Sequence, residues 1–351
     1  MTWEKAIPAH PVVAVAGATG AVGREFLQVL HDLDFPASEV RALASARSAG
    51  TTLPFEGCGD VPAGDLVVQE MTPESFEGVD IALFSAGAGV SKAMREAVTA
   101  AGAVMIDNSS AFRMDEDVPL VVPEVNPQDV AWHNGVIANP NCSTIQMVVA
   151  LKPLYDVSPI KRVVVSTYQA ASGAGAPAMA ELYDQTREFL DGTPEDELTV
   201  NAFQHRIAFN CIPHIDVFLE DGSTKEEWKM VVETKKIMGD DNIQVAATCV
   251  RVPVLRCHGE AINVEFEDEV SVEAAREALA AAPGLILMDD PANNVYPMPG
   301  ILAGTNGSYV GRLRKDPTVE HGLSFWNVAD QIRKGAALNA VQIAELLLPQ
   351  E

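Results

Sequence analysis

The stretch that most limits the possible folds of this chain lies near the N-terminus, where a strand, a glycine turn and a helix are expected in succession. The apolar run 11–16 predicts a buried strand, and residues 24–30 carry apolar side chains at helical spacing. Between them stands Gly17-Ala-Thr-Gly-Ala-Val-Gly23, whose glycines let the backbone approach a phosphate at the helix N-terminus. The spacing differs from the commoner GxGxxG, but its position after the first strand favours a dinucleotide site over an empty turn.

The residues after the next predicted strand, 39–44, indicate which dinucleotide would bind. An NAD site places an Asp or Glu about twenty residues beyond the glycines, and no acid closes this strand. Ser45, Arg47 and Ser48 follow it instead. Because a guanidinium flanked by two hydroxyl groups suits a 2′-phosphate, the sequence favours NADP over NAD. The alternative is a solvated surface arginine.

Strands and helices continue to alternate through the first half of the chain. The expected strands are 65–68, 79–84 and 103–106, and a helix is expected at 91–101. This alternation predicts a doubly wound parallel sheet of Rossmann type, in which ligands bind beyond the carboxyl ends of the strands. The loops at that edge would be 17–23, 45–50, 85–89, 107–113 and 139–142. Arg113 is then a cation on the functional edge, near Cys142 if the sheet closes as expected.

Cys142 lies in Asn139-Pro-Asn-Cys-Ser-Thr144, between the apolar run 136–138 and a helical pattern that starts near Ile145. Pro140 cannot sit inside a central strand, so the expected order is strand, tight turn and helix. A thiol at a helix N-terminus loses its proton more readily, and the thiolate is the nucleophile. The alternative is a small buried hydrophobic residue, which is the role of most free cysteines.

The second half of the chain predicts an α+β domain of long strands with few helices. Strands are expected at 161–170, 243–252 and 261–266, a helix at 224–239, a solvated acidic excursion at 184–198 and a long C-terminal helix at 326–348. The helix at 224–239 begins with a capping box and carries Glu233 and Lys236 on one face, which by spacing alone is a surface ion pair. The C-terminal helix is expected to pack back on the first domain.

Arg251 and His258 stand seven residues apart, so on a straight strand they would point to opposite faces. They converge only if the chain bends near Pro253 or before Gly259, and we predict such a bend. A histidine beside glycine and acids could titrate near neutral pH, although most such histidines are structural.

Composition excludes several classes of protein. The 351 residues suggest two domains, and a net charge of −25 argues against nucleic acid or an anionic membrane as partner. The five cysteines are an odd number without a CxxC pair, so neither a disulfide framework nor a metal site is expected. The N-terminus lacks a signal-peptide pattern and no apolar run approaches the ~20 residues of a membrane span, so we expect a cytoplasmic protein.

Taken in order, the motifs resemble those of the aspartate-semialdehyde dehydrogenase family. They are Gly17-Ala-Thr-Gly-Ala-Val-Gly23, Asn108-Ser-Ser-Ala-Phe-Arg113, Asn139-Pro-Asn-Cys-Ser-Thr144, Ser166-Thr-Tyr-Gln-Ala-Ala-Ser-Gly-Ala-Gly175, and Arg251 with His258. Each motif is modest alone, but the ordered set is specific and the similarity covers essentially the whole chain. The expected domains are 8–141 with 326–351, which would bind NADP, and 142–325, which would carry catalysis and dimerisation.

The resemblance implies a reversible reaction. L-aspartyl 4-phosphate and NADPH would give L-aspartate 4-semialdehyde, NADP and phosphate, in a pathway to lysine with diaminopimelate, threonine, methionine and isoleucine. The Cys142 thiolate would attack the acyl phosphate to form a thioester, and a hydride from NADPH would reduce it to a hemithioacetal. The resemblance also implies a homodimer built on the second domain.

The resemblance further implies roles for individual residues. His258 would be the general acid/base, Arg251 would hold the α-carboxylate and Gln169 would orient the acyl group. The phosphate would contact Arg113, Asn141 and Lys236, with Lys235 as the alternative lysine, and Glu233 would pair with the α-ammonium. The residues expected at the cofactor are Gly17, Thr19, Gly20, Ala21, Val22, Gly23, Ser45, Arg47, Ser48, Ser172, Gly173 and Asn327.

Two other readings remain. An N-acetyl-glutamyl-phosphate reductase or a glyceraldehyde-phosphate dehydrogenase would also use a cysteine and a thioester, but an acetylated amine needs no carboxylate such as Glu233. A protein of a different class would be a non-catalytic NADP-binding regulator with a silent cysteine.

Overall fold

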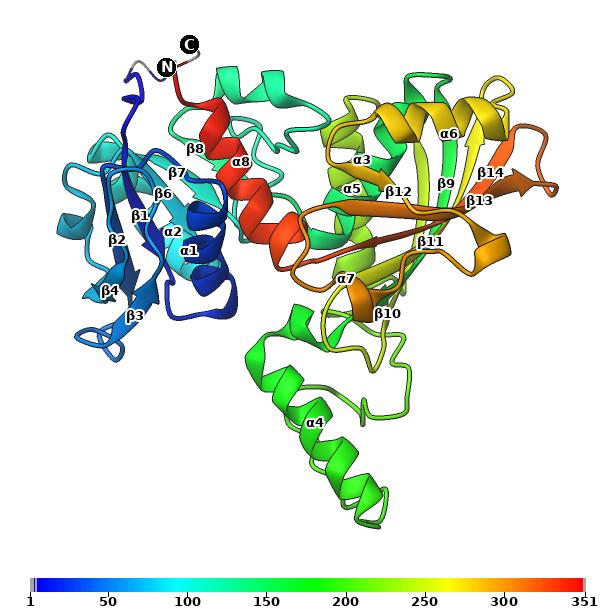
Figure 1. Ribbon diagram of the computed structural model, residues 1–351, viewed down its shortest axis with the longest axis horizontal. Helices are drawn as coiled ribbons and strands as arrows, with labels where there is room; N and C mark the ends of the chain where they lie inside the picture. Colours follow the sequence, from blue (N-terminus) through cyan, green and yellow to red (C-terminus); the bar gives the residue numbers. More distant parts are fainter. Residues whose placement is uncertain (1–2, 4, 350–351) are drawn as a thin grey trace. The chain divides into compact units, whose positions relative to one another are not determined.

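The computed structural model describes residues 3 and 5–349, and the chain divides into two compact units (Figure 1). The first unit is built from Met1–Asn141 and Gly335–Glu351, and the second from Cys142–Lys334. The first unit is therefore discontinuous in sequence.

A six-stranded parallel sheet forms the centre of the first unit, with the strand order β5-β2-β1-β6-β7-β8. Its strands are β1 (Val12–Ala16), β2 (Glu39–Ala44), β5 (Gln69–Glu70), β6 (Ile81–Phe84), β7 (Val104–Asp107) and β8 (Val136–Ala138). The chain winds outward from β1 in both directions, which confirms the predicted Rossmann-type sheet. The segment expected as a strand at 65–68 lies outside this sheet, because β4 (Gly64–Val67) pairs with β3 (Thr52–Phe55) as a separate two-stranded ribbon.

Helices α1 (Ala21–Asp32) and α8 (Leu338–Leu346) pack against each other and contribute to the same apolar core over the sheet. That core joins Phe26 and Leu30 of α1 to Val341 of α8 and to the inward side chains of the strands. Helix α2 (Ala88–Ala100) packs on β7 and on the short helix η1 (Pro73–Phe76), and η2 (Pro127–Trp132) packs on α8. The C-terminal helix is thus part of the first unit.

The glycine turn between β1 and α1 is so tightly packed that side chains are excluded at two positions. Gly17 has φ +89°, and a Cβ there would lie 2.4 Å from the carbonyl oxygen of Ser85. A Cβ at Gly23 would lie 2.1 Å from the carbonyl oxygen of Gly17. These clashes are with backbone atoms, so the two glycines fix how closely the helix approaches the strand.

A six-stranded mixed sheet forms the second unit, in the order β10-β9-β11-β14-β13-β12. Its strands are β9 (Ile160–Gln169), β10 (Gln244–Arg251), β11 (His258–Phe266), β12 (Leu285–Leu287), β13 (Ser308–Asp316) and β14 (Gly322–Ala329). The outermost pairs, β10 with β9 and β12 with β13, are parallel and the inner pairs are antiparallel. The predicted second domain of long strands is confirmed.

One face of this sheet is covered by three helices, α3 (Cys142–Tyr155), α5 (Lys225–Met238) and α6 (Val272–Ala281). The capping box predicted for α5 is present: Thr224 accepts from the backbone N–H of Glu227, whose carboxylate accepts from the N–H of Thr224. Helix α4 (Ala176–Leu190) extends away from the sheet, following the short helix η3 (Ala171–Ala174) (Figure 1). The remaining helices are η4 (Pro291–Asn293) and α7 (Pro299–Leu302).

The prediction of a single helix at 326–348 is wrong. Its first residues form the end of β14, a π-helical turn covers η5 (Arg333–Ala337), and only α8 is regular helix. Long apolar runs cannot distinguish a buried strand from a buried helix, which explains the error. The second unit accordingly extends to Lys334 rather than 325. Part of the expected solvated excursion at 184–198 is also helix, because α4 continues to Leu190.

None of the described helices combines the length and the apolar character that crossing a membrane requires.

Replacing Gly23 with alanine should destabilise the first unit, because the new Cβ would clash with immovable backbone atoms of the glycine turn. We expect the free energy of unfolding to fall by about 2 kcal/mol or more, as in an overpacked core, and the melting temperature to fall with it. Gly89→Ala is the matched control, since Gly89 lies in α2 with nothing within 4 Å of its Cβ position. Equal melting temperatures for the two variants in thermal denaturation would contradict this account of the turn.

Candidate active site

The register of the second sheet aligns three predicted site residues in one row. Arg251 of β10 pairs with Gln169 of β9, and the β9–β11 register then sets His258 opposite Gln169. All three side chains are buried, on the helix-covered face of the sheet. The row therefore lies at the end of β9, beneath the helices of the second unit.

The chain reverses between Arg251 and His258, as predicted. β10 ends at Arg251 and β11 begins at His258, on the opposite side of β9 and running in the opposite direction. The crossover includes Cys257 at φ +74°, a backbone conformation that is uncommon for a residue with a side chain. The two residues converge because they belong to different strands flanking β9, and not because one strand is bent.

His258 is fully buried, and its ring orientation is set by a backbone hydrogen bond. Its Nδ1 accepts from the backbone N–H of Ala170 at 3.0 Å, and its Nε2 lies 3.5 Å from the side-chain nitrogen of Gln169. An Nδ1 that accepts carries no proton, so the neutral ring holds its proton on Nε2. Burial lowers the pKa of His258 well below its ordinary value, and the positive charge of Arg251 lowers it further. The ring is therefore neutral and presents an Nε2–H donor, and because the Gln169 nitrogen is a donor too, no hydrogen bond joins these two nitrogens.

Arg251 is the cation of the row. Its Nη1 donates to the backbone oxygen of Ala170 at 2.7 Å, and its guanidinium lies 5.9 Å from the centre of the Phe203 ring. Burial lowers the pKa of Arg251, and the negative charges of Glu226 and of a Cys142 thiolate offset this lowering only in part. Cys142 is therefore close enough to Arg251 for the two charges to stabilise each other.

Cys142 is half-buried and is the first residue of α3, which confirms the predicted order of strand, turn and helix. One turn further along α3, Gln146 donates from its side chain to the backbone oxygen of His258 at 3.4 Å. The backbone oxygen of Gln146 accepts from the side chain of Asn327 in β14 at 2.9 Å. The helix that carries the cysteine is thus attached to the strand that carries the histidine.

Glu226 is a residue that sequence reasoning missed. It lies in the first turn of α5, is buried, and accepts from the side-chain nitrogen of Gln169 at 3.1 Å. It also forms an ion pair with Lys229 at 3.1 Å, and Lys229 pairs with Asp216 at 2.7 Å. Burial lowers the pKa of Lys229, but the two carboxylates outweigh it and the pKa is raised. A signal was present, because an acid seven residues before Glu233 shares its helix face.

Glu233 and Lys236 lie further along α5, where Glu233 is buried and Lys236 half-buried. Seven residues separate Glu226 from Glu233, which is roughly 10 Å along a helix. Lys236 lies close to the Glu233 face of the helix, whereas Lys235 projects away from it, as the spacing of an α-helix requires. The carboxylate that accepts from the side chain of Gln169, however, is that of Glu226.

Ser172 and Gly173 lie in η3, in the second unit and beside the row of Arg251, Gln169 and His258. A Cβ on Gly173 would lie 2.7 Å from Nη1 of Arg251 and 3.2 Å from Nε2 of His258. The hydroxyl of Ser172 accepts from the side-chain nitrogen of Gln331, whose oxygen accepts from the backbone N–H of Cys257. Gln331 is therefore a further residue of this region that the sequence did not reveal.

Asn327, expected at the cofactor, makes its hydrogen bonds within the second unit. Its side chain is 0% exposed, and it donates to Gln146 while accepting from the hydroxyl of Ser308 at 2.9 Å. Both polar ends of the amide are used inside the sheet, so Asn327 holds α3 in place. The family resemblance implied a cofactor role for Asn327, which lies in β14.

The residues expected at the dinucleotide lie in two loops at the carboxyl edge of the parallel sheet. No side chain caps the start of α1 at Gly20, which leaves the first N–H groups of the helix for an anion. Ser45 and Arg47 are exposed and Ser48 is half-buried in the turn after β2, the strand next to β1. This arrangement can bind a pyrophosphate at the helix and a further phosphate at Arg47. The other cofactor positions of the glycine turn are Thr19, Ala21 and Val22.

Arg113 lies at the same edge of the first unit and is buried. Its Nε donates to the backbone oxygen of Asn139 and its Nη2 to that of Asn108, both at 2.9 Å. The side chain of Asn139 in turn donates to that of Asn108 at 2.7 Å, and Asn141 is buried just before Cys142 in the chain. These bonds fix the turn that leads into the cysteine.

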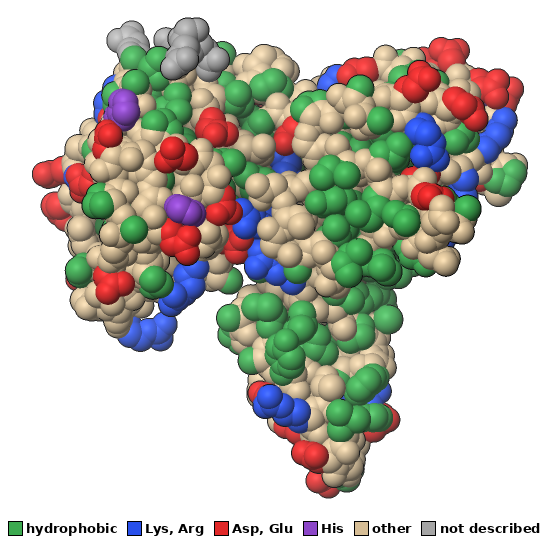
Figure 2. Space-filling view, viewed as in Figure 1, with side chains coloured by type: hydrophobic (Ala, Val, Ile, Leu, Met, Phe, Trp, Pro, Cys, Tyr) green, Lys and Arg blue, Asp and Glu red, His purple; other side chains and the backbone are tan. Residues whose placement is uncertain are grey.

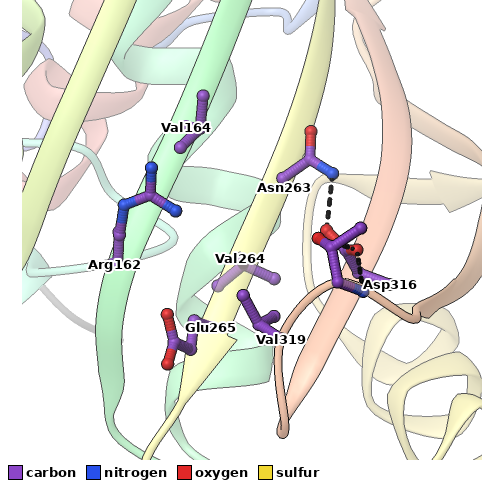
Figure 3. Close-up of a pocket in the computed structure, with 8 residues that line it drawn as sticks. Arg162, Val164, Asn263, Val264, Glu265, Asp316 and Val319 are labelled. Atoms are coloured by element: carbon purple, nitrogen blue, oxygen red, sulfur yellow. Dashed lines mark hydrogen bonds between the residues drawn. The ribbon is translucent and has the colours of Figure 1, made fainter.

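A separate hollow of about 200 Å³ lies elsewhere in the second unit (Figure 3). Arg162, Asn263 and Glu265 line it from the sheet face opposite the row, and Asn263 points at Asp316, to which it donates at 2.8 Å. Arg162 lies seven residues from Gln169 along β9, roughly 23 Å in a strand. The hollow therefore lies away from the row formed by Arg251, Gln169 and His258.

Both units match known protein families. Residues 12–133 match the family model for "Semialdehyde dehydrogenase, NAD binding domain", and residues 151–334 match that for "Semialdehyde dehydrogenase, dimerisation domain". The aspartate-semialdehyde dehydrogenase of Aquifex aeolicus (strain VF5) is 57% identical over 341 residues, which are 96% of this chain and 98% of that protein.

Two solved structures are also similar over nearly the whole chain. Aspartate semialdehyde dehydrogenase II of Vibrio cholerae, complexed with ASA, has a TM-score of 0.91 and 47% identity, with 96% of this chain and 98% of that chain covered. The enzyme of Candida albicans with NADP has a TM-score of 0.71 and 26% identity, with 96% and 98% covered. With two family models matched and more than half of the residues shared with a full-length relative, this chain belongs to the aspartate-semialdehyde dehydrogenases, a family of oxidoreductases.

Proposed function

We propose that the protein reduces L-aspartyl 4-phosphate to L-aspartate 4-semialdehyde, reversibly and with NADP, through a thioester on Cys142. The observation that carries this proposal is the buried row of Arg251, Gln169 and His258, in the same unit as Cys142. The row offers a cation for a carboxylate and an N–H donor for an oxyanion beside a nucleophile. The ASA complex of the Vibrio cholerae relative supports the choice of substrate.

Cys142 is the proposed nucleophile. The N-terminus of α3 and the guanidinium of Arg251 both favour the thiolate. The thiolate would attack the acyl carbon, a C–S bond would form and the phosphate would leave with the electrons of the broken C–O bond. In the opposite direction, phosphate would displace the thiolate from the thioester.

His258 would act as a hydrogen-bond donor and not as a proton carrier. Its Nδ1 is occupied by the N–H of Ala170, so the Nε2–H of the neutral ring is what a bound substrate meets. That donor would stabilise the oxyanion of the hemithioacetal on Cys142. No proton transfer is needed at this oxygen, because the oxyanion collapses directly to aldehyde and thiolate. The role therefore differs from the general acid/base that the family resemblance implies.

The remaining polar side chains would position the substrate. Arg251 would bind the α-carboxylate, and the buried carboxylates of Glu226 and Glu233 would favour a substrate with a free α-ammonium group. Gln169, held between Thr167 and Glu226, would orient the acyl group. The proposed phosphate ligands are Arg113, Asn141 and Lys236.

The glycine turn fits a dinucleotide, because Cβ atoms at Gly17 and Gly23 would occupy space that the tight turn requires. Arg47 and its flanking serines would hold the 2′-phosphate, which favours NADP, and the NADP complex of the Candida albicans relative supports this choice. When bound, the nicotinamide supplies or accepts the hydride. The N-terminus of α1 would hold the pyrophosphate of the dinucleotide, and Cys142 would hold the reacting carbon.

We also propose a homodimer formed through the second unit. The match to a dimerisation domain covers 151–334, and exposed apolar side chains occur on this unit, including Tyr168, Ile286, Met298 and Ile301. Figure 2 shows hydrophobic side chains gathered where β12, β13 and α7 lie. The five cysteines are free thiols, as in proteins of a reducing compartment, which supports the cytoplasm. The pathway would be that of lysine, diaminopimelate, threonine, methionine and isoleucine.

Cys142→Ser should abolish the reaction, because a serine hydroxyl at this position is a far weaker nucleophile than a thiolate. We expect kcat for phosphate-dependent NADP reduction by aspartate semialdehyde to fall about a thousandfold or more, while NADPH binding, followed by fluorescence, is retained. Cys211→Ser is the matched control, since Cys211 is an exposed thiol of the same unit. A Cys142→Ser enzyme as active as the control would refute the proposed function.

The donor role of His258 predicts different losses for two substitutions. His258→Ala removes the N–H and should lower kcat about a hundredfold, whereas His258→Gln offers an amide N–H near the same place and should lose roughly tenfold less. Because the folded ring stays neutral well below the ordinary histidine pKa, kcat should show no inflection near pH 6.5 that depends on His258. Equal losses together with such an inflection would establish proton transfer instead.

Gly173→Ala should impair substrate binding without unfolding the protein. The new Cβ would push against Nη1 of Arg251, a movable side-chain end, and φ at Gly173 permits alanine. We expect kcat/KM for the semialdehyde to fall about tenfold with the melting temperature nearly unchanged. Gly64→Ala is the control, because nothing lies within 4 Å of its Cβ position. Unchanged KM and kcat in Gly173→Ala would show that Arg251 does not need this space.

A further inference from the structure

Glu260 is a buried carboxyl that the proposed reaction does not use. It lies two residues after His258 on β11, so both side chains point to the same face of the sheet. The register places it in a second row, next to the catalytic one, between Thr167 of β9 and Asn327 of β14. Its side chain is 0% exposed, and burial raises its pKa well above the ordinary value.

Among the described residues, none of the cations offsets a negative charge on Glu260. On β10 the neighbouring ionisable group is the Cys249 thiol, on β11 it is the neutral ring of His258, and on α3 the ionisable group is Cys142, one turn before Gln146. No lysine or arginine of the described residues contributes to the pKa of Glu260. A carboxylate in this place would be an unpaired buried charge, which is strongly unfavourable.

The polar atoms next to the carboxyl point to its protonated form. The amides of Gln146 and Asn327 act against the raised pKa of Glu260, but neither Glu260 oxygen accepts a hydrogen bond of ordinary geometry from a described residue. The side-chain oxygen of Gln146 is also buried without a donor. A carboxylate cannot supply the missing donor, whereas a carboxylic acid can.

We propose that Glu260 is a positioning residue. It is held as an uncharged carboxylic acid whose O–H donates a hydrogen bond to the side-chain oxygen of Gln146. The bond docks the first turns of α3 onto the second sheet. The side-chain nitrogen of Gln146 donates to the backbone oxygen of His258, and its side-chain oxygen would accept from the O–H of Glu260. Glu260 therefore fixes the distance between the helix that carries Cys142 and the strand that carries His258.

The effect on catalysis rests on the proposed thioester function of Cys142, whereas the protonation of Glu260 does not. The two can be tested separately. Glu260→Gln keeps the shape and replaces the O–H donor by an N–H donor, while Glu260→Met removes the donor at similar volume. Glu267→Gln is the matched control, because Glu267 is exposed just beyond the end of β11.

Protonation is measured by unfolding in urea between pH 5.5 and 7.5. Below the unfolded pKa of about 4.3, Glu260 is protonated in both the folded and the unfolded state, and its contribution to stability is fully present. As the pH rises, the unfolded state loses its proton first, and the contribution is lost as the pH passes through the raised folded pKa. The unfolding constant of the wild type should therefore rise about tenfold per pH unit relative to Glu260→Gln. The ratio of the wild-type unfolding constant to that of Glu267→Gln should show no such rise. A pH-independent ratio for Glu260→Gln would mean an ionised Glu260 and overturn the proposal.

Infrared spectra give a second measurement that needs no unfolding. At pH 7 the wild type should show the carbonyl stretch of a protonated carboxyl that Glu260→Gln lacks and Glu267→Gln retains. Identical spectra for the wild type and Glu260→Gln in this region would overturn the proposal.

Positioning is measured on the folded variants. Glu260→Met should lower kcat about tenfold with little change in KM, and should raise the pH at which iodoacetamide alkylates Cys142 at half its maximal rate. Glu260→Gln should restore both. A lower melting temperature with unchanged kcat and alkylation profile would reduce Glu260 to a structural role and overturn the positioning claim. Activity that survives Cys142→Ser would remove the thioester function and leave the protonation result standing.

Discussion

The arrangement of the second unit depends on the pairing of β9 with one parallel and one antiparallel neighbour. This pairing brings together two residues that are seven positions apart in the sequence, on either side of Gln169. Side chains on a strand alternate between faces, so a slip of one residue in either pairing would turn Arg251 or His258 to the opposite face. A backbone hydrogen bond links each of these side chains to Ala170, so the end of β9 holds both the cation and the imidazole. The geometry of the site is therefore fixed by the sheet and not by a flexible loop.

Burial then decides which of these groups carry charge. Desolvation and the neighbouring guanidinium both act against a charged His258, and each pKa unit of such a shift corresponds to about 1.4 kcal/mol between the two protonation states. Arg251 stays charged because an arginine pKa starts far above neutral pH and negative groups partly offset the lowering by burial. The result is a neutral donor next to a fixed cation. In the proposed reaction this combination would stabilise a thiolate and an oxyanion without requiring that the site bind or release protons during turnover.

The sequence predicted the local units well and the tertiary contacts less well. The glycine turn, the helix start at Cys142 and the capping box of α5 all follow from short-range rules on backbone and side-chain chemistry. The segment 326–348 was misjudged because its apolar residues fit a buried strand as well as a helix. Gln331 was missed because its contact with Ser172 joins elements far apart in sequence, which spacing cannot reveal, whereas Glu226 could have been found from its spacing to Glu233 on α5. The buried position of Glu260 likewise depends on the strand register.

The central claim is that the acyl group is carried by the sulfur of Cys142. It is tested most directly by incubating the enzyme with aspartyl phosphate in the absence of nicotinamide, quenching in acid and determining the mass of each proteolytic peptide. The account predicts an aspartyl adduct on the peptide that contains Cys142, with release of one phosphate per adduct and no adduct on the peptides of the other four cysteines. An unmodified Cys142 peptide, or an adduct on a different residue while turnover continues normally with nicotinamide, would contradict it.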